Sequence, residues 1–372
     1  MIYLDYCANT PADPEVLQAF CDAALRYPGN PNSMHCAGQA AREEMARLTR
    51  GIAGLLGVHP AELIYTSGAS EANNLAIKGI AQACRSTGRH IITSPLEHTS
   101  VSGALEYLHR QGWEVEELNV KNDGTVDLEQ LRDMLRHDTV LVTLPAVDSE
   151  LGAVQPVREA AEMLKDYPNC RLHLDAAQAV GKTALMLEYA DTVSIAPHKF
   201  YGLNGSGLLI KKRGIGLEAQ IHGGSSSTPY RSGTPALALA ASIEKALSLA
   251  LPGQEERLCH VRRLNEYLRS ELRHYPAVCI NSPEGAVPHV LNISVQGVKG
   301  TVFQRELSER GICVSVRSAC SSDGAPSKAV LAVSGDRKNA LSSWRISLSH
   351  LTTQYELESF MQAFDQCCKK LL

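Results

Sequence analysis

Short apolar runs alternate with amphipathic segments through the first two thirds of the chain. Six runs of four or five residues are rich in Ile, Val, Leu and Thr and predict β-strands. They lie at 62–66, 90–93, 139–143, 171–174, 192–195 and 207–210. Helical patterns separate them at 71–84, 101–111, 127–136 and 156–165. Strands joined through helices are typical of crossover connections, so the pattern predicts an α/β fold whose mainly parallel sheet is covered on both faces.

The pattern changes after an apolar helix that ends near residue 251. A charged amphipathic helix is predicted at 255–274, followed by a strand at 288–295 and a helix at 302–309. Two further strands, near 312–316 and 344–347, and a helix at 354–371 complete the chain. No internal repeat or low-complexity linker interrupts this order. The C-terminal part is therefore predicted to form a smaller α+β domain.

Composition and charge exclude several classes of protein. The 372 residues include 36 Lys and Arg and 40 Asp and Glu, which gives a formal net charge of −4. The basic residues are scattered, which excludes the usual electrostatic patch for nucleic acid or an anionic membrane. The most apolar window, 235–251, contains Glu244 and Lys245 and is too polar for a membrane span. Because the first residues lack the features of a signal peptide, we expect a cytoplasmic protein.

The cysteines give little sign of a metal site or a disulfide framework. There are 11, an odd number, and none of them forms a Cys-x-x-Cys pair. The spacing typical of zinc ligands is therefore missing, and no metal is expected. Without a secretion signal, the thiols are expected to be reduced. Most are predicted to be small core residues.

Polar and small residues follow several of the predicted strands, where ligands of α/β proteins bind. Thr-Ser-Gly-Ala-Ser-Glu at 66–71 combines a small-residue turn with the start of a helix, a favourable place for a phosphate. The alternative is an ordinary helix cap by Ser67 or Ser70. The motif by itself does not decide between the two.

Two charged residues end neighbouring strands. Asp175 is suited to a protonated pyridine nitrogen, although it is equally suited to capping the next helix, with Gln178 as its capping-box partner. Lys199 is suited to covalent chemistry if a partly apolar cleft favours its neutral amine, whereas most lysines are solvated loop residues. A phosphate site, an aspartate and a lysine are together the three requirements of pyridoxal phosphate (PLP).

Ordered motifs along almost the entire chain carry a closer resemblance. They are Tyr-Leu-Asp-Tyr at 3–6, Gly-Asn-Pro-Asn-Ser-Met-His at 29–35, Thr-Ser-Gly-Ala-Ser-Glu at 66–71, Glu-His at 97–98, Asp-Ala-Ala-Gln-Ala-Val-Gly at 175–181, His-Lys-x-Tyr-Gly at 198–202, His-Gly-Gly at 222–224, Arg-Ser-Gly-Thr at 231–234, Asn292, Ser-Ala-Cys-Ser-Ser at 318–322 and Arg-x-Ser-Leu at 345–348. With these motifs the chain resembles the cysteine desulfurase family, a class-V aminotransferase group among the fold type I PLP enzymes.

The resemblance implies a fold type I transferase with a large domain around a mainly parallel seven-stranded sheet. The large domain is expected at 16–252, and the small α+β domain at 1–15 and 253–372, where it carries the catalytic cysteine loop. The implied cofactor is PLP, the substrate L-cysteine, and the assembly a homodimer. The implied product is L-alanine, with a persulfide on Cys320 for a sulfur-acceptor protein, as in iron–sulfur cluster assembly.

The resemblance also assigns roles to individual residues. Lys199 would hold PLP covalently and move protons, His98 would stack on the ring and transfer protons, and Cys320 would attack the substrate sulfur. Asp175 would keep the pyridine nitrogen protonated, and Thr234 would reach the phosphate from a neighbouring subunit. Residues implied in cofactor binding are Ala69, Ser70, His98, Ser149, Asp175, Gln178, His198, Lys199 and Thr234, and those implied in substrate binding are Arg345 and Asn30.

The sequence departs from the family pattern at the cofactor. Ser149 replaces an asparagine that would contact the ring hydroxyl, Asp148 adds a carboxylate near the cleft, and Ala196-Pro197 replaces Ser-Gly before the lysine motif. We expect weaker cofactor binding than in a typical relative, since each lost hydrogen bond is worth about 0.5–1.5 kcal/mol. A dedicated sulfur acceptor, rather than general cluster assembly, is a hypothesis consistent with these changes.

Two other functions remain open from the sequence. One is a C–S or C–Se lyase on the same fold, such as a selenocysteine lyase, for which Cys320 would be dispensable. The other is a non-catalytic relative that acts as a sulfur-relay module. Neither the acceptor, the pathway, the turnover rate nor the preference between cysteine and selenocysteine follows from the sequence.

Overall fold

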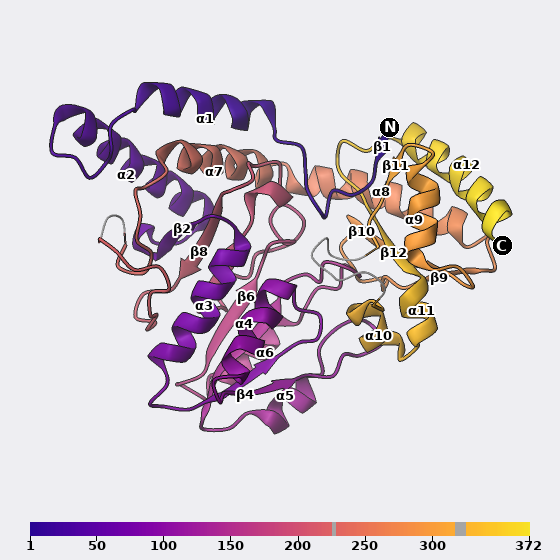
Figure 1. Ribbon diagram of the computed structural model, residues 1–372, viewed down its shortest axis with the longest axis horizontal. Helices are drawn as coiled ribbons and strands as arrows, with labels where there is room; N and C mark the ends of the chain where they lie inside the picture. Colours follow the sequence, from indigo (N-terminus) through magenta and orange to yellow (C-terminus); the bar gives the residue numbers. More distant parts are fainter. Residues whose placement is uncertain (225–227, 317–324) are drawn as a thin grey trace.

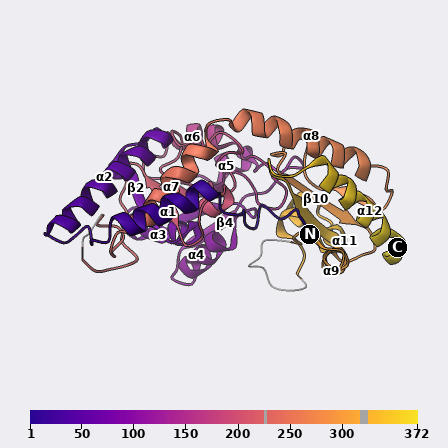
Figure 2. The same cartoon turned by 90° about the horizontal axis from the view of Figure 1, so that it is seen from above.

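Two lobes of unequal size form the molecule. The computed structural model describes residues 1–224, 228–316 and 325–372. The larger lobe is built from the first two thirds of the chain and the smaller from the last third, and both termini lie at the smaller lobe (Figures 1 and 2). The N-terminal segment crosses from the smaller lobe to the larger one.

A seven-stranded sheet forms the centre of the larger lobe. In spatial order its strands are β2 (Leu63–Thr66), β8 (Gly207–Lys211), β7 (Thr192–Ile195), β6 (Arg171–Asp175), β5 (Thr139–Pro145), β3 (His90–Thr93) and β4 (Glu114–Glu117). Neighbouring strands from β7 to β4 are parallel, and β8 is antiparallel to both of its neighbours. The predicted mainly parallel sheet is therefore confirmed.

Helices cover both faces of this sheet. They are α1 (Pro14–Arg26), α2 (Cys36–Leu56), α3 (Ala69–Ala83), α4 (Thr99–His109), α5 (Leu128–Met134), α6 (Val157–Leu164) and α7 (Leu237–Ala250). Successive strand residues point to opposite faces. Thus Leu209 packs into the core with α3 and α4, whereas Leu208 and Ile210 pack into the core with α6 and α7. Burial on both faces explains why these strands appear as continuous apolar runs.

The smaller lobe is an α+β unit, as predicted. Its antiparallel sheet has the order β12 (Ser343–Ser347), β10 (Val290–Val295) and β9 (Val278–Ile280), and β1 (Ile2–Tyr3) pairs with β11 (Ile312–Cys313). Its helices are α8 (Gln254–Leu272), α9 (Gly300–Ser308), α10 (Lys328–Ser334), α11 (Arg337–Ser342) and α12 (Gln354–Leu371). Trp344 stacks on Phe303 in its buried core, with ring centroids 5.2 Å apart.

We propose that the domain boundaries lie near residues 15/16 and 252/253. Leu4 packs into the core of the smaller lobe, whereas Val16 packs into the core of the larger lobe. In the same way, Ala250 belongs to the larger core and Val261 to the smaller. The chain therefore changes core close to both expected positions.

Some elements differ from the sequence-based expectation. The edge strand β4 was not predicted because Glu-Val-Glu-Glu has no apolar run, and its place at the edge leaves it half exposed. The strand expected at 312–316 contains only Ile312 and Cys313. None of the helices in the described part of the chain combines the length and apolar character needed to cross a membrane.

Candidate active site

A cavity of about 350 Å³ opens where several strands of the large sheet end. The turn after β2, the end of β6 and the segment after β7 each contribute to its wall, as do residues from the smaller lobe. This position is typical of ligand sites in α/β proteins. The predicted site residues that line it are Ala69, Ser70, His98, Ser149, Asp175, Gln178, His198, Lys199 and Arg345.

The start of α3 forms one end of the cavity. The helix is capped by Gly68, which makes no side-chain hydrogen bond, so the alternative of a side-chain cap by Ser67 or Ser70 is wrong. The chain passes so close to β8 here that a Cβ on Gly207 would lie 2.5 Å from the Gly68 Cα. Glu71 fixes the turn by accepting from the Ser67 amide at 2.8 Å and by pairing with Arg231 at 2.8 Å. The amide end of the helix therefore faces the cavity and favours an anion there.

Asp175 is held by a buried polar network. One carboxylate oxygen accepts from Asn73 Nδ2 at 2.8 Å and the other from the Ala177 amide at 2.9 Å. The side chain of Asn73 directs its amide nitrogen toward Asp175, because its amide oxygen contacts His173 Nε2 at 3.1 Å and accepts from the Ser194 hydroxyl. Burial lowers the pKa of His173 and keeps that ring neutral. The contact with Ala177 resembles the predicted cap, but no helix follows Asp175 directly.

A second carboxyl group, that of Glu97, lies near this network. Glu97 is buried, and its desolvation, together with the neighbouring Asp175, raises its pKa well above the ordinary value. It accepts from the Thr143 hydroxyl at 2.6 Å. Burial thus favours the neutral form of Glu97, which does not line the cavity, whereas Asp175 does line it.

His98 is fixed in one orientation at the cavity wall. It caps α4, with its Nδ1 accepting from the Ser100 amide at 3.2 Å and lying 2.9 Å from the Ser100 hydroxyl. Burial lowers its pKa, so the ring is neutral near pH 7. Since Nδ1 is an acceptor, Nε2 carries the proton. The ring therefore presents either its face or this N–H to a ligand.

Lys199 is the last residue of a short 3₁₀ turn, η2 (Pro197–Lys199), which begins shortly after β7. Its ammonium donates to the carbonyls of Cys7 and Ala8, each at 2.7 Å. Burial lowers its pKa from 10.5 to about 8. Two residues later Tyr201 has a φ of 67°, which is held by a 2.7 Å bond from its amide to the Thr10 hydroxyl. The loop is therefore locked, and the lysine amine is easily deprotonated.

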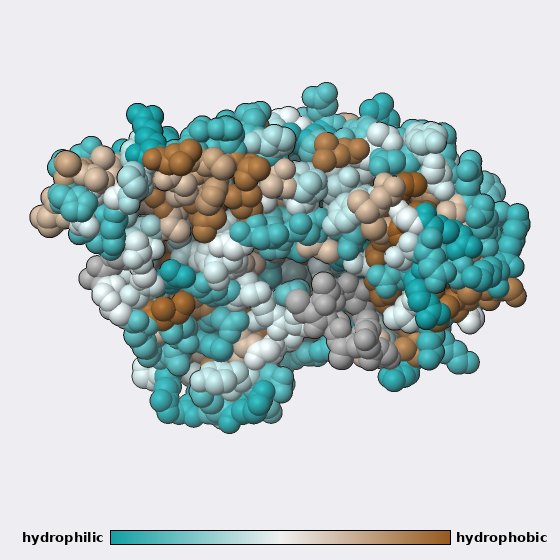
Figure 3. All heavy atoms as spheres, turned by 45° about the horizontal axis from the view of Figure 1, so that its top comes forward, coloured by the Kyte–Doolittle hydropathy of each residue, from teal (hydrophilic) through white to brown (hydrophobic). Residues whose placement is uncertain are grey.

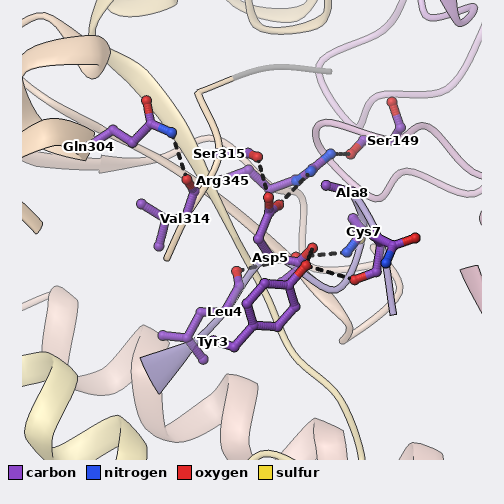
Figure 4. A network of polar contacts seen from close by, with 12 residues as sticks. Tyr3, Leu4, Asp5, Cys7, Ala8, Ser149, Gln304, Val314, Ser315 and Arg345 are labelled. Atoms are coloured by element: carbon purple, nitrogen blue, oxygen red, sulfur yellow. Dashed lines mark hydrogen bonds and ion pairs between the residues drawn. The ribbon is translucent and has the colours of Figure 1, made fainter. Parts of the chain in front are cut away.

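Arg345 joins the smaller lobe to the larger lobe at the cavity. It lies on β12 and is 2 % exposed, and its Nη2 pairs with Asp5 at 3.1 Å. Its Nη1 donates to the carbonyl of Ser149 at 2.6 Å, and Ser315 donates to the other oxygen of Asp5 at 2.7 Å (Figure 4). The Arg345 Nε has no hydrogen-bond partner among the described residues. That nitrogen is fully buried, but Nη1 and Nη2 carry two N–H groups each, so the guanidinium still has N–H groups for a second acceptor.

The remaining predicted residues lie elsewhere. Asn30 and Thr234 are both exposed and line a separate hollow beside α1 and α7, so one chain does not bring them to Lys199. Cys320 falls outside the described residues. The Asp148 carboxylate does not line the cavity, because it accepts from the amides of Glu150, at 3.2 Å, and Leu151. The added carboxylate therefore stabilises its own turn, and burial raises its pKa to about 7.

Several contributors to the site were missed from the sequence. Asp5 had a signal, since it is a lone acid between Tyr3 and Tyr6 at the start of a buried segment. Asn73 had a weaker one, one helical turn after Ser70. The carbonyls of Cys7 and Ala8 carry no side-chain signal at all. In the described part of the chain, no group of three or more His, Cys, Asp or Glu residues is placed to hold a metal ion.

Comparisons with known proteins identify the family. The model of the family "Aminotransferase class-V" matches residues 2–360. The "NifS/IcsS protein homolog" of Lactobacillus delbrueckii subsp. bulgaricus is 37% identical over 372 residues, 98% of this chain and 97% of its own. "Cysteine desulfurase IscS" of Dictyoglomus turgidum is 34% identical over 375 residues, 100% of this chain and 95% of its own.

Solved structures agree with these relatives. One called "NIFS-LIKE PROTEIN" has a TM-score of 0.93 and 31% identity, with full coverage of both chains. Another, "SspA in complex with cysteine", has a TM-score of 0.82 and 28% identity over 95% of this chain and 100% of its own. The predicted fold type I architecture is confirmed. The chain thus belongs to the class-V aminotransferases and, within them, to the cysteine desulfurase family.

Proposed function

We propose that this protein is a PLP-dependent cysteine desulfurase that converts L-cysteine to L-alanine and holds the released sulfur as a persulfide on Cys320. One observation carries the proposal. A single cavity brings together a lysine with a lowered pKa, a buried carboxylate and an arginine, in a chain whose relatives are named cysteine desulfurases.

The residues of the cavity fit PLP. The amide end of α3, with Ser70 and Ala69, suits the phosphate. Asp175 is 6 % exposed and pairs with no cation in the described part of the chain, and a protonated pyridine nitrogen would supply one. Lys199 lines the same cavity and suits the aldehyde. When bound, PLP withdraws electrons from the substrate and weakens the bonds around its Cα.

The side chains of the protein then divide the remaining work. Arg345 lines the cavity and binds the substrate carboxylate through its Nη N–H groups. Lys199 accepts and returns protons at Cα, since its lowered pKa suits both steps near neutral pH. The thiolate of Cys320 attacks the substrate sulfur. The C–S bond breaks, an S–S bond forms, and the electron pair left on carbon takes up a proton, so that L-alanine leaves and the enzyme keeps one sulfur.

Product analysis with a Cys320→Ala variant tests the proposal. The purified protein is incubated with PLP, L-cysteine and a reducing thiol, and alanine and pyruvate are quantified. We expect alanine from the wild type and about 10²-fold less from the variant, because the nucleophile is lost. Cys259→Ala, which removes an exposed thiol, is the matched control and should behave like the wild type.

Two outcomes would contradict the desulfurase proposal. Pyruvate as the main product would indicate elimination by a C–S lyase. Alanine formed equally well by the Cys320→Ala variant would show that no persulfide on this residue is needed. If pyruvate is the main product, a parallel assay with selenocysteine as the substrate distinguishes a C–S lyase from a C–Se lyase.

The pKa of Lys199 predicts how PLP attachment depends on pH. Only the neutral amine reacts with an aldehyde, and its fraction rises as the pH rises through the pKa of about 8. We expect the attachment rate to the apoprotein to rise about tenfold per pH unit below this value and to level off above it. Stopped-flow absorbance from about pH 6 to 10 measures this rate. A rate that keeps rising above pH 9 would contradict the lowered pKa.

The substitutions at 149 and 196 predict weak cofactor binding. Ser149 and Ala196 both line the cavity. Restoring the family residue by Ala196→Ser or Ser149→Asn should each tighten PLP binding by about 2- to 12-fold, which corresponds to one hydrogen bond of about 0.5–1.5 kcal/mol. A fluorescence titration of the apoprotein measures the affinity. If neither variant binds PLP more tightly, the substitutions are not the cause of weak binding.

The proposed assembly is a homodimer. Thr234 and Asn30 line the same hollow, which is separate from the cavity that contains Lys199. Thr234 can therefore contact a PLP phosphate only in the cavity of a second copy of the chain. Apolar side chains gather on the surface of the larger lobe where α1 lies (Figure 3), and Leu17 and Leu25 of this helix are 50% and 83% exposed. Sedimentation analysis that finds only monomers would overturn the dimer.

The proposed location is the cytoplasm, because the described cysteines are free thiols, as in a reducing compartment. The sulfur is passed to an acceptor protein.

A further inference from the structure

A second cavity lies behind Lys199, between the two lobes. Its volume is about 160 Å³, enough for a small ion and a few waters. Cys7 and Lys199 line both cavities, but the start of α3 and Asp175 do not reach this one. The larger lobe contributes Lys182, and the smaller lobe contributes Arg257, His289 and His350. The cavity is therefore separate from the candidate phosphate site.

The positive charge of this cavity is not neutralised by the protein. The Lys182 ammonium donates to the amide oxygen of Gln178 at 2.7 Å, and Arg257 donates to the carbonyls of Ala250 and Pro252. Neither cation forms an ion pair within the described ranges. Asp13, the acid in the lining, accepts from the Glu15 amide at 2.8 Å as the cap of α1. Lys182 and Arg257, in addition to Lys199, thus face a space with one engaged carboxylate.

His289 supplies an independent sign of a missing ligand. It is 7 % exposed, and its Nδ1 finds no hydrogen-bond partner in the part of the chain that the structure describes. A buried imidazole without an acceptor is unfavourable. Burial and the nearby charges of Lys182, His350 and Arg257 lower its pKa to about 3. The neutral ring carries one N–H, and the residue lines the cavity, so an acceptor bound there is a candidate partner for that N–H.

We propose that this cavity binds a small oxyanion, a phosphate or a carboxylate, through Lys182, Arg257 and His289. Such an anion neutralises Lys182 and Arg257 and accepts a hydrogen bond from His289. Lys182 follows Gly181 in the larger lobe, whereas Arg257 lies on α8 and His289 just before β10 in the smaller. The bound anion therefore links the two lobes directly behind the lysine of the candidate active site, and it does so whichever reaction that site performs.

Calorimetric titration of the PLP-saturated protein tests this site. Inorganic phosphate is titrated first and acetate separately, at constant ionic strength, in the absence of L-cysteine. We expect one ion to bind per chain. The His289→Leu and Lys182→Gln variants should each bind at least about tenfold more weakly, since each removes a donor to a charged group. Lys212→Gln removes the same charge outside the cavity and should bind like the wild type.

The two titrations separate the sources of the anion. Tighter binding of phosphate than of acetate assigns the cavity to a phosphate group, and the reverse order assigns it to a carboxylate. Absence of binding for both ions overturns the proposal. So does binding that is unchanged in both His289→Leu and Lys182→Gln, with circular dichroism confirming that the variants are folded, because the ion then binds elsewhere.

Discussion

Replacing Lys199 by arginine is expected to lower alanine formation from L-cysteine by about 10²- to 10⁴-fold, the usual range for loss of a general acid–base group. The guanidinium keeps the positive charge and the length of the side chain. It stays protonated at any accessible pH, so it neither accepts a proton nor attacks an aldehyde. We also expect the variant to lose the absorbance band of covalently held PLP.

The control for this experiment is Lys212→Arg. Lys212 lies just after β8, outside the cavity, and its ammonium donates to a backbone carbonyl. Activity and absorbance should both stay at the wild-type level. A Lys199→Arg protein that keeps the absorbance band and more than a tenth of the activity would exclude Lys199 as the cofactor lysine.

Asp175→Asn is expected to impair both activity and stability. The carboxylate accepts two hydrogen bonds, from Asn73 Nδ2 and the Ala177 amide. An asparagine must turn its NH₂ group toward one of these donors, because the Asn73 oxygen is already used by His173 and Ser194. This buried mismatch should lower the free energy of unfolding by about 1–3 kcal/mol. Loss of the charge opposite the pyridine nitrogen should lower kcat by about 10²- to 10³-fold.

A double variant separates the two effects of Asp175→Asn. Asn73→Asp in the same chain returns an acceptor to the network, so it should recover part of the stability measured by urea unfolding. It should not recover kcat, because the restored carboxylate lies behind residue 175 rather than in the cavity wall. Equal recovery of both quantities would show that Asp175 acts only through folding.

Local sequence patterns predicted most strands of the larger lobe. The strands β3 and β7 lie at the predicted residues because their apolar runs are buried on both faces and end at polar residues. Sequence patterns did not predict strands that are exposed at a sheet edge, or the length of a strand that its pairing partner limits. Strand β4 carries three glutamates and exists because its backbone pairs with β3 at the edge of the sheet. Strand β11 is short because it pairs with only the two residues of β1.

The candidate site shows the same division. Asp175 and Lys199 were predicted because each follows a predicted strand and has a side chain suited to one part of PLP chemistry, whereas His98 was assigned through the family resemblance; all three line the cavity. Asp5 was missed as the partner of Arg345 because 340 residues separate the two along the chain. Asn30 and Thr234 could not be placed either, since the surface that they share is made by α1 and α7.

The sequence by itself therefore determined which groups are available: the family motifs, the order of most strands and helices, and many of the residues that line the cavity. Only the tertiary structure decided their chemical state. Burial lowers the pKa of Lys199 to about 8 and raises that of Glu97, and packing turns the Asp148 carboxylate away from the cavity. These effects arise from desolvation and from partners distant in the sequence, which no local pattern records.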